Sequence, residues 1–452
     1  MVDVYSAEEA RGGILRRLPM EDAKVPPHVQ AGLNEFFQCE GITPHEAVRR
    51  ILKDVSERGD AAVQHWNETI DKVKLPQVEL PSERLVQVLS NQDPQFVDAL
   101  RVARDRIVEF HRQQPITSWI TTSLGGQLGQ LVTPIERIAV YVPGGTAPLP
   151  STVLMSALPA VVAGSREIMI LSPPGKATGS ISDATLAACA VVSELPQVNL
   201  RVFQVGGAQA IAAAAFGTES IPRADKIVGP GNLFVTLAKR EVFGRVGIDG
   251  IYGPTEALVL ADGTADPRLV AADLLAQAEH DFLAIPILIT PDRSLALAVQ
   301  SEVERQLETL PRKEVAAHSL KSQGGIVLGQ DMEECIQLTN DFAAEHVSLA
   351  VSSPWDLVGK VRNAGGLFLG EKSCEVLGDY IAGPSHVMPT GGSARFSGPL
   401  SVIDFVKIIS LVGLDQTSIL KIAPLAERIA REEGLDAHAN AARMRYADDT
   451  QR

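Results

Sequence analysis

The segment LRVFQVGGAQAIAA at residues 200–213 decides the fold class of this chain. Residues 200–205 are mostly apolar and suit a strand, and they run directly into Gly206 and Gly207. A run of small, helix-forming residues follows the two glycines. A glycine pair between a strand and a helix is typical of a tight turn. We therefore predict a strand, a turn and a crossover helix in this segment.

The same order of strand, turn and helix recurs around this segment. Further strands are predicted at residues 135–142, 167–171 and 226–228, and glycine turns follow the first and last at residues 143–145 and 229–232. Repeated units of this kind imply a parallel sheet, whose ligands lie beyond the carboxyl ends of the strands. Glycines and helix N-termini there can accept a phosphate. A strict Gly-x-Gly-x-x-Gly fingerprint is absent, so each turn alone can be ordinary, whereas several together favour a nucleotide site.

A second alternating run predicts a second α/β domain. Its strands are predicted at residues 256–260, 285–289, 325–328, 346–351 and 366–369, with helices between them that include residues 294–309 and 354–363. Residues 42–112 show the apolar spacing of helices, and the chain is expected to be helical again from Ser401. The expected fold class is α/β, with two Rossmann-like parallel-sheet domains, an incomplete dinucleotide fingerprint, a small helical N-terminal arm and a C-terminal tail domain. The predicted division is an arm over residues 1–30, a discontinuous first α/β domain over 31–140 and 255–400, a second α/β domain over 141–254, and a helical tail over 401–452.

Composition restricts the class of protein. The chain has 452 residues, of which 45% are hydrophobic and 21% charged, as in an ordinary globular protein of two to four domains. The 41 basic and 55 acidic residues give a net charge of −14, which argues against nucleic-acid binding through a basic surface. No apolar run is long enough to cross a bilayer and the N-terminus lacks a secretion signal, so we expect a cytoplasmic protein. None of the four cysteines forms a Cys-x-x-Cys pair, which disfavours thiolate zinc sites and redox motifs.

Gln277 and His280 are candidate metal ligands at the end of a predicted helix. Asp266 suits the N-cap of this helix and Pro267 its first position. Residues three apart lie on one helical face, so the Gln277 amide oxygen and the His280 imidazole can approach one ion. A Gln and a His at this spacing more often form a solvated or hydrogen-bonded helical face. A metal site at Gln277 and His280 would need further ligands from other parts of the chain.

Other polar residues stand in loops or at junctions between elements. Asp379 and His386 share a glycine- and proline-rich loop, and Glu345-His346 lies at a helix-to-strand junction. His438 lies in the tail. Each also has a structural explanation: His386 as a turn cap, His438 as an exposed residue, and Glu345-His346 as a surface pair. Amide, imidazole and carboxylate groups together suit zinc without thiolates.

In their order and over nearly the whole chain, these motifs resemble those of the histidinol dehydrogenase family. The matching motifs are YVPGGTAPL at 141–149, VGGAQAIA at 205–212, GPGN at 229–232, QAEH at 277–280, AEH at 344–346 and GDYIAGPSH at 378–386. The resemblance implies a homodimeric, zinc- and NAD-dependent histidinol dehydrogenase (EC 1.1.1.23). Such an enzyme oxidises L-histidinol to L-histidine through L-histidinaldehyde, the last step of histidine biosynthesis.

The resemblance also implies roles for single residues. It makes Glu345 and His346 the acid/base pair, with His346 as general base and Glu345 activating the water that attacks the aldehyde. The implied zinc ligands are Gln277, His280, Asp379 and His438. The implied NAD contacts are Tyr141, Gln209 and Asn232. The implied substrate contacts are Thr255, Gln277, His280, His346, Asp379, Glu433 and His438. The tail should carry Glu433 and His438 into the partner subunit's site, and His386 receives no role.

One departure from the family concerns Thr255, since Ser is common at this position. The hydroxyl is kept, and the added methyl group narrows the pocket. Three other functions stay open from the residues alone. A zinc hydrolase would also use a metal, a Glu and a His but would give no NAD-dependent absorbance change. A non-catalytic ligand clamp leaves the converging polar set unexplained, and a related dehydrogenase of another amino alcohol or diol is disfavoured by the presence of both Glu433 and His438.

Overall fold

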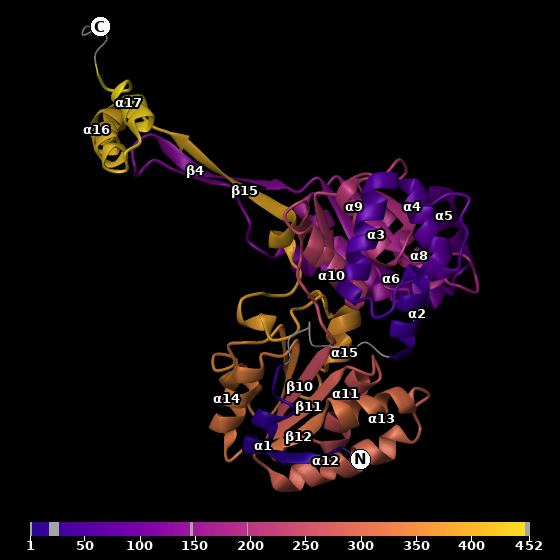
Figure 1. The fold of residues 1–452 in the computed structure, drawn as a ribbon. Coiled ribbons are helices and arrows are strands. Elements are labelled where there is room, and N and C mark those ends of the chain that lie inside the picture. Colours follow the sequence, from indigo (N-terminus) through magenta and orange to yellow (C-terminus); the bar gives the residue numbers. More distant parts are fainter. Residues whose placement is uncertain (1, 18–26, 145–147, 197, 448–452) are drawn as a thin grey trace. The chain divides into compact units, whose positions relative to one another are not determined.

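The computed structural model describes residues 2–17, 27–144, 148–196 and 198–447 (Figure 1). Gly145 of one predicted turn, residues 18–26 of the predicted arm and residues 448–452 of the tail lie outside the described residues. By the compactness of their internal contacts, residues 1–113 and 136–404 form one unit, and residues 114–135 and 405–452 form another. The domain limits predicted from the sequence stay a prediction.

One sheet of the first unit contains the segment that decided the fold class. Its strand order is β2-β7-β6-β5-β8-β9, and its neighbours are parallel except β2, which is antiparallel to β7. The strands are β2 (Glu79–Leu80), β5 (Arg137–Tyr141), β6 (Glu167–Ser172), β7 (Asn199–Gln204), β8 (Lys226–Val228) and β9 (Gly247–Ile248). The predicted strands and the helix after Gly206 are confirmed. The chain order reverses between β5 and β8, and such a switch point is where α/β sheets bind ligands.

Helices cover both faces of this sheet. They are α2 (Pro27–Phe37), α3 (Pro44–Arg58), α4 (Asp60–Trp66), the π-helix η2 (Asn67–Asp71), α5 (Ser82–Asn91), α6 (Pro94–Arg112), α7 (Pro150–Ala163), α8 (Asp183–Ser193), α9 (Gly207–Phe216) and α10 (Leu233–Val242). Ala139 and Tyr141 of β5 pack with residues of α3, α4, α9 and α10 in one buried cluster. α7 and α8 contact the sheet as well. The helices predicted within residues 42–112 are confirmed.

The second sheet of this unit is parallel throughout, in the order β1-β12-β11-β10-β13-β14. Its strands are β1 (Val4–Ser6), β10 (Glu256–Ala261), β11 (Ile285–Thr290), β12 (Gly325–Leu328), β13 (His346–Ala350) and β14 (Gly366–Leu369). The order β12-β11-β10-β13-β14 matches the order β7-β6-β5-β8-β9 of the first sheet strand by strand. The switch point, where the chain order reverses, therefore lies between β10 and β13. The prediction of two Rossmann-like parallel sheets is therefore confirmed.

Every residue of β10 is buried, because helices cover both faces of this sheet. Leu258 and Leu260 join a cluster with α1 (Ala7–Gly12) and α14 (Met332–Phe342), whereas Val259 and Ala261 join one with α11 (Pro267–Ala278), α12 (Arg293–Leu307) and α13 (Lys313–Ser322). Figure 1 shows α14 and α11 on opposite sides of the β10–β12 strands. After β14 the chain forms α15 (Glu375–Leu377), the π-helix η4 (Gly378–Ala382) and the 3-10 turns η5 (Ser393–Arg395) and η6 (Val402–Phe405).

The second unit is a three-stranded antiparallel sheet with two helices. The sheet order is β15-β4-β3, formed by β3 (Trp119–Thr121), β4 (Gln127–Pro134) and β15 (Val406–Gly413), and the helices are α16 (Gln416–Glu432) and α17 (Asp436–Arg443). The tail thus contains, besides its helices, a strand that the sequence analysis did not predict.

The helix predicted at residues 354–363 is wrong. Only the 3-10 turn η3 (Pro354–Leu357) forms. Gly359 weakens a continuing helix, and the Asn340 side-chain oxygen instead accepts hydrogen bonds from the N–H groups of Arg362 and Asn363. Among the described residues, no helix is long and apolar enough to cross a membrane.

Candidate active site

Glu345 directly precedes β13 and His346 is its first residue, and β13 lies between β10 and the edge strand β14 of the second sheet. α14 ends at Phe342, and Ala343 adopts a left-handed conformation (φ 54°) that turns the chain toward the strand. Glu345 is 7% exposed and His346 3% exposed. A surface pair is therefore excluded, and two ionisable groups are held inside the protein at the sheet edge.

Neighbouring groups at the start of β10 hold the Glu345 carboxylate. The Thr255 hydroxyl donates to Glu345 Oε2 at 2.6 Å, and the N–H of Glu256 donates to the same oxygen at 3.0 Å. Burial raises the pKa of Glu345 to about 7, although His346 and these hydrogen bonds oppose the shift. Glu345 therefore changes charge near neutral pH, which suits a group that must take up and release a proton.

Both nitrogens of the His346 ring have acceptors as neighbours. Nδ1 lies 3.2 Å from the carbonyl oxygen of Glu256, and Nε2 lies 3.1 Å from Asp379 Oδ1. Burial alone lowers the pKa of His346, but the carboxyl groups of Glu375, Glu345 and Asp379 outweigh it and raise the pKa well above its usual value. A carbonyl only accepts, so Nδ1 carries a proton, and Nε2 is the nitrogen that can exchange one.

Asp379 lies in the π-helix η4, and irregular helices of this kind are frequent at functional sites. Burial alone raises the pKa of its carboxyl group, but the hydrogen bond from His346 and the nearby His386 and His280 rings outweigh it and lower the pKa. His386 Nδ1 donates to the Asp379 carbonyl oxygen at 2.9 Å, and its Nε2 lies 3.4 Å from Thr152 Oγ1. His386 therefore anchors the loop that carries Asp379, in keeping with the turn-cap interpretation.

Gln277 ends α11 as a fully buried amide with unused hydrogen-bonding groups. Asp266 caps this helix and Pro267 starts it, as predicted. Gln277 is 0% exposed, and neither its Oε1 nor its Nε2 has a hydrogen-bond partner among the described residues. A buried amide without partners is costly, so it fits a site that a ligand completes.

His280 lies two residues beyond the end of α11, on the surface of the single chain. Desolvation by neighbouring protein atoms lowers the pKa of its ring, and the nearby Asp379 opposes this shift. A neutral imidazole is the form that binds a metal. Within the described part of the chain, no three His, Cys, Asp or Glu side chains lie close enough together to hold a metal ion. Any metal site in the first unit therefore needs the Gln277 amide or a ligand from outside that unit.

Glu375 is a buried carboxyl group that the sequence did not single out. It begins α15 and is 2% exposed. Burial raises its pKa to about 8, since the opposing effect of His346 is smaller and Asp379 adds to the rise. Its burial depends on how the loop after β14 folds, and the local sequence carries no sign of this. A further carboxyl group with a raised pKa thus belongs to the same cluster.

This cluster lies at the amino ends of its strands. Glu256 is the first residue of β10 and His346 the first of β13, the two strands at the switch point of the second sheet. In α/β sheets ligands usually bind beyond the carboxyl ends of the strands, but the polar cluster of the second sheet lies at the opposite ends. The hydrogen bonds described above hold this cluster together.

The first sheet does place predicted ligand contacts at its carboxyl ends. Tyr141 ends β5, Gln209 lies in the first turn of α9 after β7, and Asn232 caps α10 after β8. The Gly207 N–H donates to the Tyr141 hydroxyl at 3.1 Å, and burial raises the pKa of Tyr141 to about 12. The Asn232 side-chain oxygen accepts from the N–H groups of Phe234 and Val235 in the first turn of α10, and this cap does not use its NH₂ group.

A buried ion pair holds the glycine turn before Asn232. The Lys239 ammonium donates to Asp249 Oδ1 and, at 3.0 Å, to the Gly229 carbonyl oxygen, while the Gly229 N–H donates to Asp249 Oδ2 at 2.6 Å. Gly229 has φ 107°, and a Cβ there would collide with the Tyr141 carbonyl oxygen. The turn is therefore held against the end of β5.

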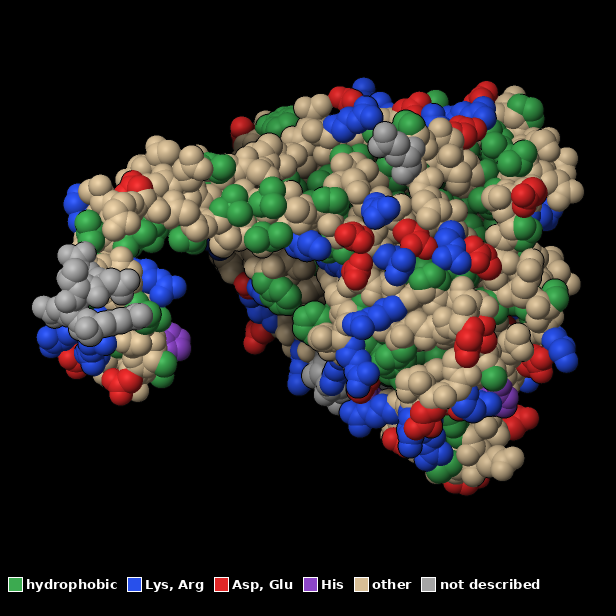
Figure 2. Space-filling model, turned by 90° about the horizontal axis from the view of Figure 1, so that it is seen from above, with side chains coloured by type: hydrophobic (Ala, Val, Ile, Leu, Met, Phe, Trp, Pro, Cys, Tyr) green, Lys and Arg blue, Asp and Glu red, His purple; other side chains and the backbone are tan. Residues whose placement is uncertain are grey.

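Glu433 and His438 belong to the second unit. Glu433 follows the last residue of α16 and His438 lies on α17, and both are exposed in the single chain. Hydrophobic side chains are visible on the surface of this unit (Figure 2). Ile422, Leu425 and Ile429 share one face of α16 and are 44%, 64% and 62% exposed.

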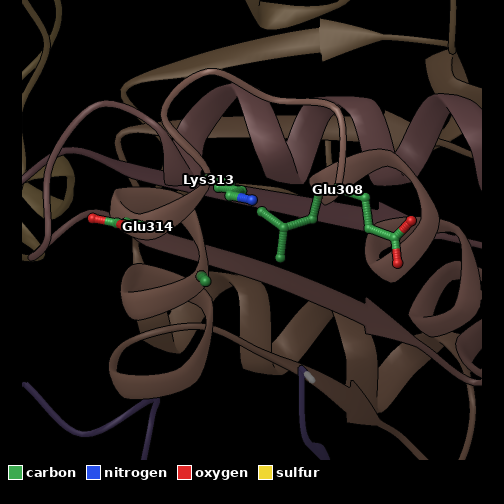
Figure 3. Close-up of a pocket in the computed structure, with 5 residues that line it drawn as sticks. Glu308, Lys313 and Glu314 are labelled. Carbon is green, nitrogen blue, oxygen red and sulfur yellow. The ribbon is translucent and has the colours of Figure 1, made fainter.

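A hollow of about 550 Å³ lies apart from these residues, at the loop that joins α12 and α13 (Figure 3). Its lining residues are Leu307, Glu308, Lys313, Glu314 and Ala317. Their charges are mixed, and none of them belongs to the cluster or to the turns of the first sheet. We assign this hollow no role.

Comparison with known proteins gives consistent results. A sequence model of the family described as histidinol dehydrogenase matches residues 40–446. The histidinol dehydrogenase of Deinococcus radiodurans is 47% identical over 98% of this chain and 100% of its own length, and that of Thermus thermophilus is 47% identical with the same coverage. The crystal structure of histidinol dehydrogenase from Elizabethkingia anophelis covers 98% of both chains with a TM-score of 0.87 and 34% identity.

Proposed function

The chain belongs to the histidinol dehydrogenase family, and from this premise we propose that it oxidises L-histidinol to L-histidine through L-histidinaldehyde, with NAD as the hydride acceptor. This reaction is the last step of histidine biosynthesis, and we propose that it takes place in the cytoplasm. The observation that carries the proposal is the buried Glu345–His346 pair in the same cluster as Asp379.

His346 is the base of the first oxidation. The Glu256 carbonyl holds the proton on Nδ1, so Nε2 is the nitrogen that accepts the proton of the substrate hydroxyl, and it does so in the form of the ring that carries no proton there. The carbon that carries this hydroxyl loses a hydride as the aldehyde forms, and NAD, when bound, accepts that hydride. The carboxyl groups around His346 favour its charged form and so stabilise the proton that it has taken up.

Glu345 is the base of the second oxidation. The aldehyde must add water before a second hydride can leave, and Glu345 removes a proton from that water. The Thr255 hydroxyl bonds to Glu345 here, so its methyl group stands beside the catalytic carboxylate. We propose that Thr255 also contacts the substrate, as the family resemblance implies.

We further propose zinc ligation by Gln277, His280, Asp379 and His438. The residues of the first unit fit such an ion because the buried Gln277 amide has no partner among the residues described, and the lowered pKa of His280 keeps its ring neutral. Zinc, when bound, supplies a redox-inactive Lewis acid that holds the substrate. With Glu433, these ligands fix the substrate beside His346 and limit escape of the aldehyde.

We expect about one zinc ion per chain, as one four-ligand site requires. The His280→Ala variant should lose most of this zinc, measured by elemental analysis after gel filtration. His318→Ala is the matched control, because His318 is also exposed but packs against Phe282. Full zinc retention in His280→Ala would refute the ligand assignment.

Tyr141, Gln209 and Asn232 are the proposed NAD contacts. Support comes from their place at the carboxyl ends of β5, β7 and β8, where α/β sheets bind dinucleotides. Gln209 Oε1 is buried and has no hydrogen-bond partner in the part of the chain that the structure describes, while its NH₂ donates weakly to Asp71 Oδ2 at 3.3 Å. An acceptor free for a ligand therefore stands at this edge.

The Gly229→Ala variant tests this site. Its methyl group would press on Tyr141, so we expect the KM for NAD to rise about tenfold or more with little change in the KM for L-histidinol. Gly244→Ala is the matched control, because Gly244 has φ 96° and no atom within 4 Å of the added Cβ. Both variants bear a left-handed alanine, which costs about 1–2 kcal/mol. Equal KM values for NAD in the two would contradict the assignment.

We also propose a homodimer in which the tail completes the partner's site. Support comes from the exposed apolar face of α16 and from the exposure of Glu433 and His438. An apolar helical face of this kind is stabilised by a partner surface.

The decisive experiment mixes purified protein with L-histidinol and NAD and follows NADH at 340 nm. Two NADH per L-histidinol and L-histidine as product are expected. NADP in place of NAD measures the cofactor preference. No NADH from L-histidinol, with zinc present, would refute the proposed function and favour a hydrolase.

A further inference from the structure

We propose that Arg17 is a positioning residue for the Glu345–His346 pair, and that it acts by holding Glu256. The inference rests on the proposed function in one respect, namely that Glu345 and His346 carry the chemistry. Arg17 itself touches neither of them through a hydrogen bond or ion pair among the described residues. It therefore acts at one remove.

The peptide groups of Glu256 bond to both members of the pair. Its N–H donates to Glu345 Oε2 at 3.0 Å, and its carbonyl accepts from His346 Nδ1 at 3.2 Å. The first bond orients the carboxylate, and the second keeps Nε2 as the nitrogen that exchanges protons. A shift at the first residue of β10 would disturb both groups together.

The side chain of Glu256 is held in place by charge. It is 1% exposed, and the Arg17 guanidinium donates to both of its oxygens, with Nη2 2.8 Å from Oε2. The Gly391 N–H adds a hydrogen bond to Oε1 at 2.9 Å. A buried carboxylate is tolerated only when it is paired, and a two-pronged arginine pair also fixes direction.

Arg17 also holds the residue that leads into Glu345. Its Nη2 donates to the Phe342 carbonyl oxygen at 2.8 Å, and its guanidinium lies 3.7 Å above the Phe342 ring. Phe342 ends α14, three residues before Glu345. One side chain thus links Glu256, the first residue of β10, to the segment that leads into the catalytic pair at the start of β13.

Arg395 offers a matched control at the same helix end. It donates to the carbonyl oxygens of Asn340 and Asp341 in the last turn of α14. No hydrogen bond or ion pair joins it to Glu256 in the part of the chain that the structure describes. Removing Arg395 therefore perturbs the same helix end but leaves Glu256 paired.

The experiment compares Arg17→Met with Arg395→Met by steady-state kinetics on the full-length, zinc-loaded enzyme. We expect Arg17→Met to lower kcat between about 10- and 100-fold, the range for a small misplacement of catalytic groups, with both KM values and the zinc content little changed. Arg395→Met should keep kcat within about twofold, as surface substitutions do. A purely structural role would lower thermal stability in both and spare kcat per folded site.

Glu256→Gln supplies the second arm. It removes the charge that Arg17→Met leaves unpaired, so the double variant should recover at least about threefold in kcat over Arg17→Met. If Arg17→Met does not fold, Arg17→Lys takes its place, since lysine keeps the charge but loses the two-pronged geometry. A kcat equal to that of Arg395→Met in whichever Arg17 variant folds overturns the proposal. The wild-type protein, assayed in the same series, tests the proposed function separately. If the wild-type protein formed no NADH from L-histidinol, the proposed function would be refuted, whereas a failure of the Arg17 variants alone would refute only the positioning role.

Discussion

Replacing His346 by alanine is expected to lower kcat for the oxidation of L-histidinol about 10²- to 10⁴-fold, the usual contribution of a general base. The reason lies in the ring's surroundings: Nδ1 is tied to the Glu256 carbonyl, and no other histidine begins β13 or β10. Stopped-flow absorbance at 340 nm measures the loss. The zinc content should stay unchanged, because His346 is not among the proposed ligands.

Glu345→Gln should separate the two half-reactions. Histidinaldehyde oxidation needs a base for water and should fall more than histidinol oxidation when each is assayed alone. Because burial raises the pKa of Glu345 to about 7, and only the ionised carboxylate accepts a proton, the wild-type aldehyde step should speed up as pH rises, with the midpoint of the rise near pH 7. Glu345→Gln should lose this dependence. Equal, small losses in both half-reactions would contradict the assigned roles.

Mixing two inactive variants is expected to restore activity. In a mixed dimer of His280→Ala and His438→Ala, one site would collect both defects and the other neither, if the tail serves the partner. Half of the sites in each mixed dimer would then work, so complete random exchange should return about a quarter of wild-type activity. The measurement is NADH formation before and after subunit exchange, with exchange confirmed by mass spectrometry.

The control mixture combines His280→Ala with Asp379→Ala. Both defects lie in the first unit, so every site of a mixed dimer keeps one of them and no activity should return. If the tail served its own chain, the first mixture would behave like this control. Absence of recovery after confirmed exchange would therefore refute the shared site.

The sequence predicted the parallel sheets well because their strands are short, apolar and followed by glycine turns. Residues 226–228, 325–328 and 366–369 were located to the residue. β15 was missed because its sequence, VKIISLVG, lacks the regular alternation of apolar and polar residues that marks a half-buried strand. Its partner β4 also lies far away in the chain. The helix predicted at residues 354–363 failed because the Asn340 side chain competes for its N–H groups.

The candidate site was only partly visible in the sequence. Gln277 and His280 were recognised by their spacing of three residues on a predicted helix, and Glu345-His346 by its place between a helix and a strand. The roles of these residues came from the family resemblance. Glu256 and Arg17 were not singled out. Their importance depends on contacts between distant positions of the chain, 239 apart for Arg17 and Glu256 and 89 apart for Glu256 and Glu345. The second contact arises only when β10 and β13 pair in register. Local sequence carries no trace of such contacts.

The pairing of β4 with β15 has a consequence for synthesis of the chain. β4 is the central strand of its sheet, and it leaves the ribosome about 270 residues before β15. At the usual rate of translation of about 5–20 residues per second, one edge of β4 stays unpaired for about 14 to 54 s. Until β15 is made, the N–H and C=O groups along this edge of β4 have no strand to pair with. Leu131 on β4 remains 39% exposed even in the finished sheet, so an apolar side chain is exposed on the same strand. Chaperone demand during translation should therefore concentrate on residues 119–134, the strands made first and completed last.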